Sequence, residues 1–147
     1  MLCCYEAKKR AGVTGKVIGL CHSERSTERL KKLGFCDVVF AADATKPVPV
    51  MEKIEEITGG KMCDITINNV NIPDTEMTSV LCTKDDGIVY FFSMATSFTK
   101  AALGAEGVGS DVTMIVGNGY TKGHAEITLQ ELRECEALRK IFTELYA

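Results

Sequence analysis

The feature that most constrains the fold is residues 16–40, where two short apolar segments flank one amphipathic segment. Residues 17–21 are apolar without alternation, which is typical of a strand covered on both faces in a parallel sheet. Ser23 is a favourable N-cap for the amphipathic segment, and Gly34 suits the left-handed end of a helix. The stretch therefore predicts a strand, a crossover helix and a second strand.

The rest of the chain continues this alternation. Strands are predicted at residues 17–21, at the segment ending with Phe40, and at residues 63–70, 88–92 and 112–116. Regular alternation of apolar strands and helices is typical of an α/β protein. We therefore predict a Rossmann-like, doubly wound parallel sheet of five strands with helices on both faces.

Helices are predicted over residues 1–10, from Pro49 to Gly59, and over residues 73–82. Residues 128–131 read Thr-Leu-Gln-Glu, the form of a capping box that would start a C-terminal helix.

Two segments are predicted to be irregular. Residues 85–87 read Asp-Asp-Gly and are predicted to form a turn before the strand at 88–92, and residues 104–109 are predicted to be too rich in glycine for a helix.

Composition excludes several functional classes. The 147 residues carry a net charge of −3, which gives no basic surface for nucleic acid, and their length suits one domain. No apolar run approaches the roughly 20 residues of a membrane span, so we expect a soluble, cytoplasmic protein. The seven cysteines include no C-x-x-C pair, so we expect reduced thiols that pack as small apolar side chains, and no metal site.

Four segments in order carry a resemblance to a known family: residues 16–19, 28–39, 63–70 and 86–94. Together they resemble the cofactor domain of medium-chain dehydrogenases. The similarity is greatest to those of anaerobic lysine fermentation that oxidatively deaminate the C3 amine of a diamino acid. The resemblance implies NAD as hydride acceptor, with NADP as the alternative, and a homodimer formed through the edge strand at residues 112–116.

The family pattern also implies parts that this sequence lacks. Such domains begin with a strand and a Gly-x-Gly-x-x-Gly turn, which cradles the pyrophosphate. In the 3-2-1-4-5-6 order that first strand lies between the strands at residues 17–21 and 63–70. We therefore expect a partial dinucleotide-binding domain over residues 1–147 that folds poorly and binds no dinucleotide when it is expressed alone.

Candidate cofactor contacts follow from the positions that match the family. An acidic residue normally ends the second strand of the domain, whereas this chain has Cys21, followed by side chains that could meet ribose hydroxyls or a 2′-phosphate. For these side chains, for the adenine-pocket position and for the loop at residues 93–95, a plain turn is the alternative. For residues 117–118 the alternative is a contact with a partner subunit. The implied contacts are His22, Ser23, Arg25, Asp43, Asn68, Asn69, Val70, Ser93, Met94, Ala95, Gly117 and Asn118.

No catalytic residue can be named from the sequence, and His124 is expected to face solvent. Two other functions stay open: another medium-chain NAD(P)-dependent oxidoreductase acting on an alcohol or carbonyl, and a non-catalytic nucleotide-binding or receiver-like module. A receiver needs an acidic cluster at the strand ends, and only Asp43 fits that pattern.

Overall fold

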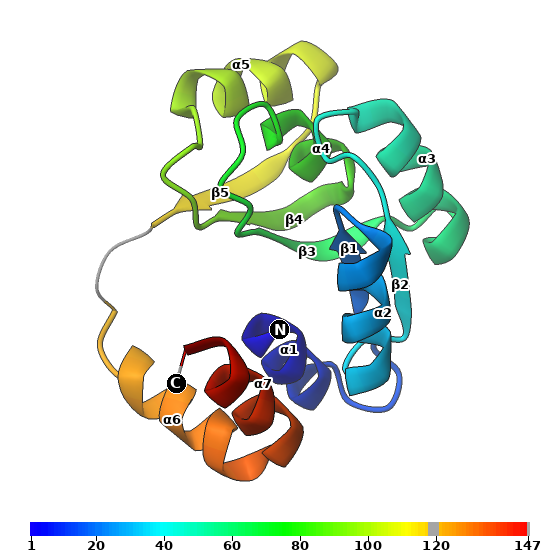
Figure 1. Ribbon diagram of the computed structural model, residues 1–147. Coiled ribbons are helices and arrows are strands. Elements are labelled where there is room, and N and C mark those ends of the chain that lie inside the picture. The colour runs from blue at the N-terminus through cyan, green and yellow to red at the C-terminus, as the bar shows by residue number, and fades with distance from the viewer. Residues whose placement is uncertain (118–120, 147) are drawn as a thin grey trace. The chain divides into compact units, whose positions relative to one another are not determined.

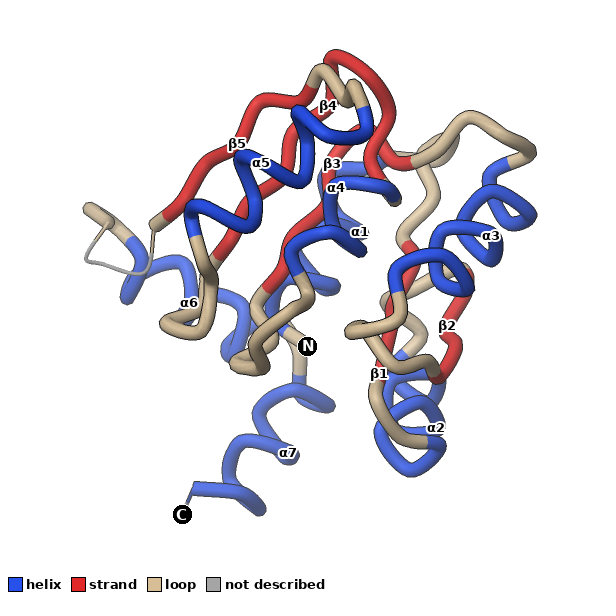
Figure 2. Tube along the Cα trace, turned by 90° about the horizontal axis from the view of Figure 1, so that it is seen from above, coloured by secondary structure: helices blue, strands red, loops and turns tan. Residues whose placement is uncertain are grey.

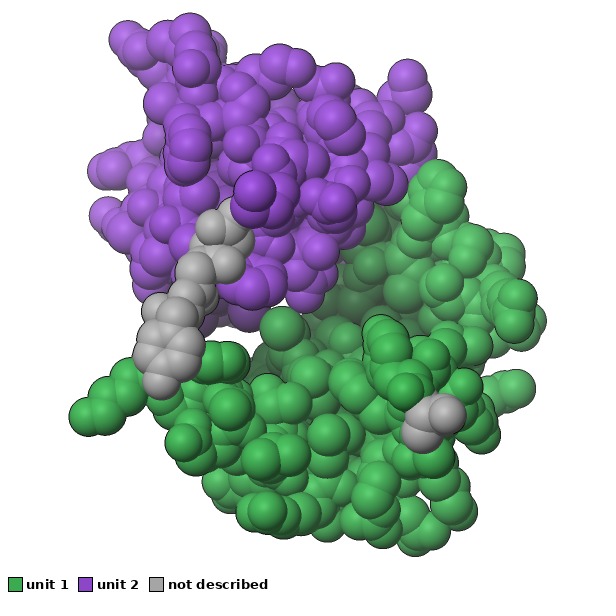
Figure 3. Space-filling model, turned by 60° about the vertical axis from the view of Figure 1, so that its left-hand side comes forward, with its two compact units in different colours: residues 1–42, 120–147 green, residues 43–119 purple. Residues whose placement is uncertain are grey.

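The computed structural model describes residues 1–117 and 121–146. The chain divides into two compact units, residues 1–42 with 120–147 and residues 43–119 (Figure 3). Both contain parallel strands and helices, which confirms the predicted α/β class.

The first unit combines both ends of the chain (Figure 1). Its two strands are parallel, and their register runs from Ile18 opposite Val38 to Cys21 opposite Ala41. The elements are α1 (Leu2–Ala11), β1 (Ile18–Cys21), α2 (Glu24–Leu33), β2 (Val38–Ala41), α6 (His124–Glu134) and α7 (Glu136–Tyr146).

Helix α2 forms as its sequence predicts. The Ser23 Oγ atom accepts a hydrogen bond from the Ser26 amide at 3.3 Å, and Gly34 ends the helix with a φ of 68°. Leu30 is buried against β1, where a Cβ atom on Gly19 would lie only 2.7 Å from the Leu30 Cδ2 atom. Glycine at position 19 therefore lets the helix approach the strand closely.

The second unit is a three-stranded parallel sheet in the order β3-β4-β5 with its helices (Figure 2). Val89, Phe91 and Ala101 form a buried cluster, against which Val112 and Met114 pack. The elements are α3 (Pro47–Thr58), β3 (Cys63–Asn68), α4 (Glu76–Leu81), β4 (Thr83–Phe91), α5 (Phe98–Val108) and β5 (Val112–Val116).

The prediction that residues 104–109 form no helix is wrong, because α5 runs through Val108. Ser97 caps its first turn and Gly109 ends it with a φ of 66°. A Cβ atom on Gly104 would lie 3.0 Å from the Met77 Cε atom, so the missing side chain lets α5 pack closely on α4. This glycine serves helix packing, which outweighs its low helix propensity.

The predicted turn at residues 85–87 is also wrong, since these residues lie inside β4. The register of β3 and β4 shifts between Cys63 and Ile65, and Asp86 has a φ of 60°. An irregularity of this kind bends a strand without ending it. The acidic pair and the glycine mark that bend.

Three predicted boundaries also need correction. Helix α3 begins at Pro47, two residues before Pro49, and β3 ends at Asn68. Thr128 caps no helix, because α6 already begins at His124 and the Thr128 hydroxyl donates to the His124 carbonyl at 3.0 Å. The Thr-x-x-Glu spacing thus lies within a helix instead of starting one.

The strands pair in two separate sheets. Within the described residues, β1 pairs with β2 alone and β3 pairs with β4 alone. Ile65 and Ile67 in β3 are 59% and 46% exposed, so this strand is not covered on both faces. Within each sheet the neighbouring strands are those expected from the 3-2-1-4-5-6 order.

Candidate functional site

The carboxyl end of β1 leads into the polar turn of residues 22–25. His22 and Arg25 have exposed side chains, and both can donate hydrogen bonds. Hydrogen bonds to nearby residues stabilise the turn: the buried Thr27 hydroxyl donates to the Ser23 carbonyl at 3.0 Å. The Ser23 hydroxyl also donates to the Ser26 hydroxyl at 3.0 Å.

Cys21 stands at the end of β1, where the family pattern expects an acidic residue. Its thiol is half-buried, and this burial raises its pKa, opposed by a hydrogen bond with Thr27. The position therefore carries no negative charge at neutral pH. A neutral group here neither prefers ribose hydroxyls nor repels a 2′-phosphate.

Asp43 opens the segment before α3. Its Oδ1 atom accepts hydrogen bonds from the Thr45 amide at 2.9 Å and the Thr45 hydroxyl at 2.7 Å. The Lys46 amide donates to the Asp43 carbonyl at 3.0 Å. Asp43 thus stabilises its own turn.

Asn68 ends β3 with a buried side chain that is 7% exposed. Its Nδ2 atom lies 2.9 Å from the Thr75 hydroxyl and 2.9 Å from the Ser79 hydroxyl. Its Oδ1 atom accepts a hydrogen bond from the Val70 amide at 3.1 Å. One amide group therefore holds the end of β3, the following loop and α4 together.

Sequence reasoning missed the partners of Asn68 and the buried acid beside them. The hydroxyls of Thr75 and Ser79 donate onward to the carbonyls of Ile72 and Thr75, at 3.3 and 3.1 Å. The Glu76 carboxylate is 2% exposed and accepts a hydrogen bond from the Ser97 amide at 2.7 Å. The sequence indicates this network only through its polar residues Glu76, Thr78 and Ser79, which lie in a short helix with an otherwise apolar face.

The loop after β4 carries the other candidate contacts. The Ser93 hydroxyl accepts a hydrogen bond from the Ala95 amide at 3.1 Å and donates to the Asn71 Oδ1 atom at 3.3 Å. This links the loop after β4 to the loop after β3, where Asn69 is exposed and Val70 is half-buried. Met94 is 83% exposed. The structure thus places these predicted residues on adjoining loops at one sheet edge.

Gly117 follows β5 at the same edge. Its carbonyl accepts a hydrogen bond from the Tyr90 hydroxyl at 3.0 Å, and its amide donates to the Phe91 carbonyl at 3.1 Å. Asn118, the last predicted contact, lies outside the described residues.

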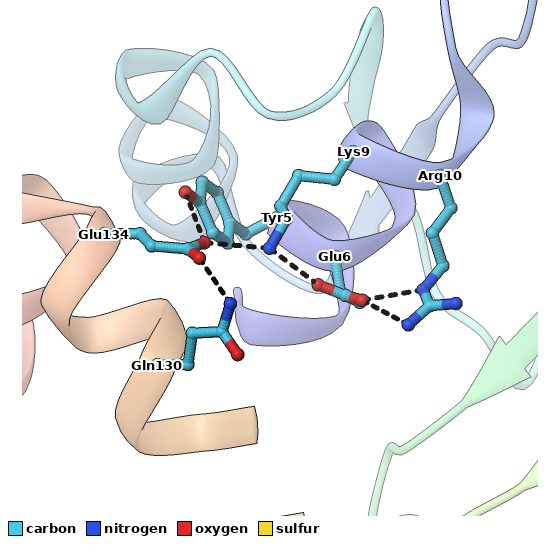
Figure 4. Close-up of polar contacts among 6 residues, drawn as sticks. All are labelled: Tyr5, Glu6, Lys9, Arg10, Gln130 and Glu134. Carbon is cyan, nitrogen blue, oxygen red and sulfur yellow. Dashed lines mark hydrogen bonds and ion pairs between the residues drawn. The ribbon is translucent and has the colours of Figure 1, made fainter. Parts of the chain in front are cut away.

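A polar cluster joins α1 to α6 within the first unit (Figure 4). The Lys9 ammonium lies 2.8 Å from a Glu134 carboxylate oxygen, and this bond raises the pKa of Lys9 and lowers that of Glu134. The Glu134 carboxylate also accepts hydrogen bonds from the Tyr5 hydroxyl at 3.4 Å and the Gln130 side-chain amide at 2.6 Å. The Glu6 carboxylate pairs with the Lys9 ammonium at 3.3 Å and the Arg10 guanidinium at 2.6 Å. These side chains hold the two helices together and lie on no strand end.

Glu131 is the buried member of α6. Its side chain is 4% exposed, and its Oε2 atom has no hydrogen-bond partner among the described residues. Burial raises its pKa, and the nearby Glu6 carboxylate raises it further. A carboxyl group in this setting is held in its neutral form more readily than one in water.

A nicotinamide cofactor fits the donor chemistry of these edges. The end of β1 offers exposed hydrogen-bond donors, although its last residue, Cys21, supplies no carboxylate. The loop after β4 has small side chains at Ser93 and Ala95 that permit close approach of a ligand.

In the described part of the chain no helix is long and apolar enough to cross a membrane.

The model of one protein family, described as zinc-binding dehydrogenase, matches residues 2–126. A metal site does not accompany that match. In residues 1–117 and 121–146 no three His, Cys, Asp or Glu side chains are grouped to hold a metal ion, and none of the seven cysteines forms a disulfide. The described residues therefore offer no set of ligands that fits a zinc ion.

Two curated relatives are similar over 99% of the chain. They are the L-erythro-3,5-diaminohexanoate dehydrogenases of Acetoanaerobium sticklandii, 59% identical, and of Fusobacterium nucleatum subsp. nucleatum, 56% identical. The chain spans 42% of the length of each relative.

Two solved structures share the fold. A quinone oxidoreductase of Pseudomonas syringae pv. tomato is 19% identical with a TM-score of 0.55, and the match covers 97% of this chain and 41% of that one. A mycobacterial quinone oxidoreductase is 17% identical with a TM-score of 0.59, and the match covers 96% of this chain and 42% of that one. At this level of identity the likeness concerns the fold alone.

Proposed function

The chain belongs to the zinc-binding dehydrogenase family, and from this premise we propose that it forms part of the nicotinamide-binding domain of an amino-acid dehydrogenase. The proposed reaction is the oxidative deamination of L-erythro-3,5-diaminohexanoate to 5-amino-3-oxohexanoate in lysine fermentation, in the cytoplasm. The observation that supports it is 59% and 56% identity to two dehydrogenases of that name over 99% of the chain.

We assign the end of β1 to the adenosine ribose. His22 and Arg25 are exposed donors beside the N-terminus of α2, which favours negative charge. We place NAD first because the family resemblance favours it. NADP is the alternative, because Cys21 offers no carboxylate for the ribose hydroxyls and the donors that follow it suit a 2′-phosphate. Asp43 is assigned to the adenine pocket.

We assign the edge of the second unit to the nicotinamide ribose. The exposed amide of Asn69, the backbone of Val70 and the loop of Ser93, Met94 and Ala95 would orient the ring, and Gly117 would border it. Asn68 acts as a positioning residue, since its side chain is occupied by Thr75, Ser79 and Val70. When bound, the cofactor supplies the hydride acceptor for C3 of the substrate.

The sheet edges indicate what would complete this domain. Strands β1 and β3 each have one partner among the described residues, and an unpaired edge leaves backbone amides and carbonyls without bonds. We propose that one further parallel strand, followed by a glycine-rich turn, joins β1 to β3 in the full-length protein. Substrate contacts and the proton acceptor for the amine would lie in parts of that protein outside this chain.

We also propose that the full-length protein is a homodimer paired along β5. Ile115 and Val116 are 44% and 40% exposed on this outer strand of the β3-β4-β5 sheet. An exposed apolar edge strand is a template for pairing with a second copy. Replacing Ile115 with Lys is expected to give monomers in sedimentation analysis, whereas replacing the exposed Ile72, which lies outside the strands, is expected to leave the dimer intact.

The activity is tested on the full-length protein with L-erythro-3,5-diaminohexanoate and either NAD or NADP. We expect reduced cofactor and ammonium in equal amounts, with NAD preferred. Reduction of the cofactor by simple alcohols but not by the diamino acid would instead identify a carbonyl oxidoreductase of the same family.

The cofactor site is tested with a matched pair on α2. Arg25 lies in the first turn, and Arg29 is another exposed arginine one turn later. Arg25→Ala is expected to weaken NADH binding by about tenfold, the loss of one charged hydrogen bond, and Arg29→Ala to leave it unchanged. Cys21→Asp is expected to weaken NADP binding, since a carboxylate repels the 2′-phosphate. Equal effects of the two arginine variants would refute the assignment.

A further inference from the structure

Two cysteines far apart in the sequence meet in the first unit. Cys4 lies in the first turn of α1, and Cys36 lies between α2 and β2. Their thiols are hydrogen-bonded to each other, and both side chains are half-buried. The Cys36 sulfur also lies 3.1 Å from where a Cβ atom on Gly19 would be, so it packs against β1.

The contact is held by residues on either side of both cysteines. The ring of Tyr5 packs edge to face on the ring of Phe35, with centroids 5.1 Å apart. The Lys8 ammonium lies 2.6 Å from the Asp37 carboxylate, which accepts a hydrogen bond from the Val17 amide at 2.8 Å. Helix α1 is thereby fixed on residues 35–37, and the two thiols are kept together by their neighbours.

The two sulfurs differ in character. The hydrogen bond from Cys36 lowers the pKa of Cys4 to about 6, although burial opposes this shift. The same bond and burial raise the pKa of Cys36 well above its ordinary range. Cys4 is therefore the more acidic of the two thiols, and Cys36 keeps its proton. One nucleophilic thiolate beside one protonated thiol is the arrangement of a redox-active pair.

We propose that Cys4 and Cys36 form a redox-active thiol pair, which a hydroperoxide converts into a disulfide joining α1 to the segment before β2. The Cys4 thiolate attacks the O–O bond, becomes a sulfenic acid and releases hydroxide. The Cys36 sulfur then displaces the hydroxyl group from the Cys4 sulfur, and its proton leaves as water. Overall the two thiols lose two electrons and two protons, and hydrogen peroxide is reduced to two waters.

The test treats the reduced full-length protein with one equivalent of hydrogen peroxide, blocks the remaining thiols and maps disulfides by mass spectrometry without reduction. We expect a link between the peptide containing Cys4 and the peptide containing Cys36. Cys4→Ser and Cys36→Ser should each abolish it. Cys3→Ser is the matched control, because Cys3 is the exposed neighbour of Cys4 on the same helix, and it should preserve the link.

A second measurement separates this chemistry from a folding defect. Cys36→Ala removes the hydrogen bond to Cys4, so in the reduced protein the pH at which alkylation of Cys4 by iodoacetamide reaches half of its plateau rate should move upward. The alkylation rate at pH 6.5 should fall by about fivefold, because the higher nucleophilicity of a more basic thiolate offsets part of its lower fraction. Cross-linking of Cys36 that persists in Cys4→Ser, or an unchanged alkylation profile in Cys36→Ala, would overturn the proposal. Neither result bears on the dehydrogenase activity proposed above.

Discussion

The Asn68→Ala variant tests the network at the end of β3. An amide nitrogen carries two hydrogens, so we count two donated bonds, to the hydroxyls of Thr75 and Ser79 at 2.9 Å, and one accepted bond from Val70 at 3.1 Å. A buried hydrogen bond contributes about 1 kcal/mol, and its loss leaves partners unsatisfied. The variant is therefore expected to lower the free energy of unfolding by about 3 kcal/mol.

The assay is urea unfolding of the full-length protein followed by circular dichroism, with hydrogen exchange at the Val70 amide as a local probe. Asn71→Ala is the control, because Asn71 is exposed and accepts one hydrogen bond from Ser93 at 3.3 Å. We expect the control to cost about 0.5 kcal/mol or less. Asn68→Asp keeps the acceptor for Val70 but loses both donated bonds, so it should destabilise the protein while protecting that amide. A loss below about 1 kcal/mol in Asn68→Ala would refute the reasoning.

Three further variants test single features. Gly107→Ala should raise the free energy of unfolding by about 0.5–1 kcal/mol, because alanine has the higher helix propensity and its Cβ atom would meet nothing within 4 Å. Thermal unfolding measures this change, and a lower stability of the variant would contradict the prediction. Ser23→Ala should cost about 1 kcal/mol through the lost cap of α2, whereas Ser26→Ala, which keeps the capping hydroxyl, should cost less. The pKa of Glu131 is raised in the folded state, so folding favours the protonated carboxyl group. The ionised carboxylate therefore destabilises the folded protein increasingly as the pH rises past the ordinary pKa of glutamate. Glu131→Gln should therefore raise the melting temperature more at pH 8 than at pH 4, and an equal change at both would refute this.

Local chemistry predicted the opening of the fold well. Ser23 and Gly34 bound α2 as their residue types require, and β5 spans the predicted residues 112–116. These features depend on interactions between residues that are close in the sequence, so the sequence alone is enough to predict them. The family match likewise confirms the resemblance carried by the ordered strands.

The errors came from tertiary contacts. Gly104 lies in a helix because it faces Met77 on α4, and Thr128 lies mid-helix because α6 starts earlier, after Gly123. Neither partner is visible in the local sequence. The role of Asn68 as a cofactor contact stays a prediction, but its hydrogen bonds to Thr75, which precedes α4, and to Ser79 in α4 also depend on a tertiary contact that the sequence did not reveal.

The structural unit built from both ends of the chain sets an order for folding during translation. Lys9 in α1 binds Glu134 in α6, 125 residues later. Residues 43–119 contain every strand of the β3-β4-β5 sheet and leave the ribosome before α6 does. Helix α1 can pack early on residues 35–37 through Tyr5 and Lys8, but its contact with α6 forms only after the rest of the chain has been made. A stalled nascent chain would therefore expose the face of α1 that α6 later covers.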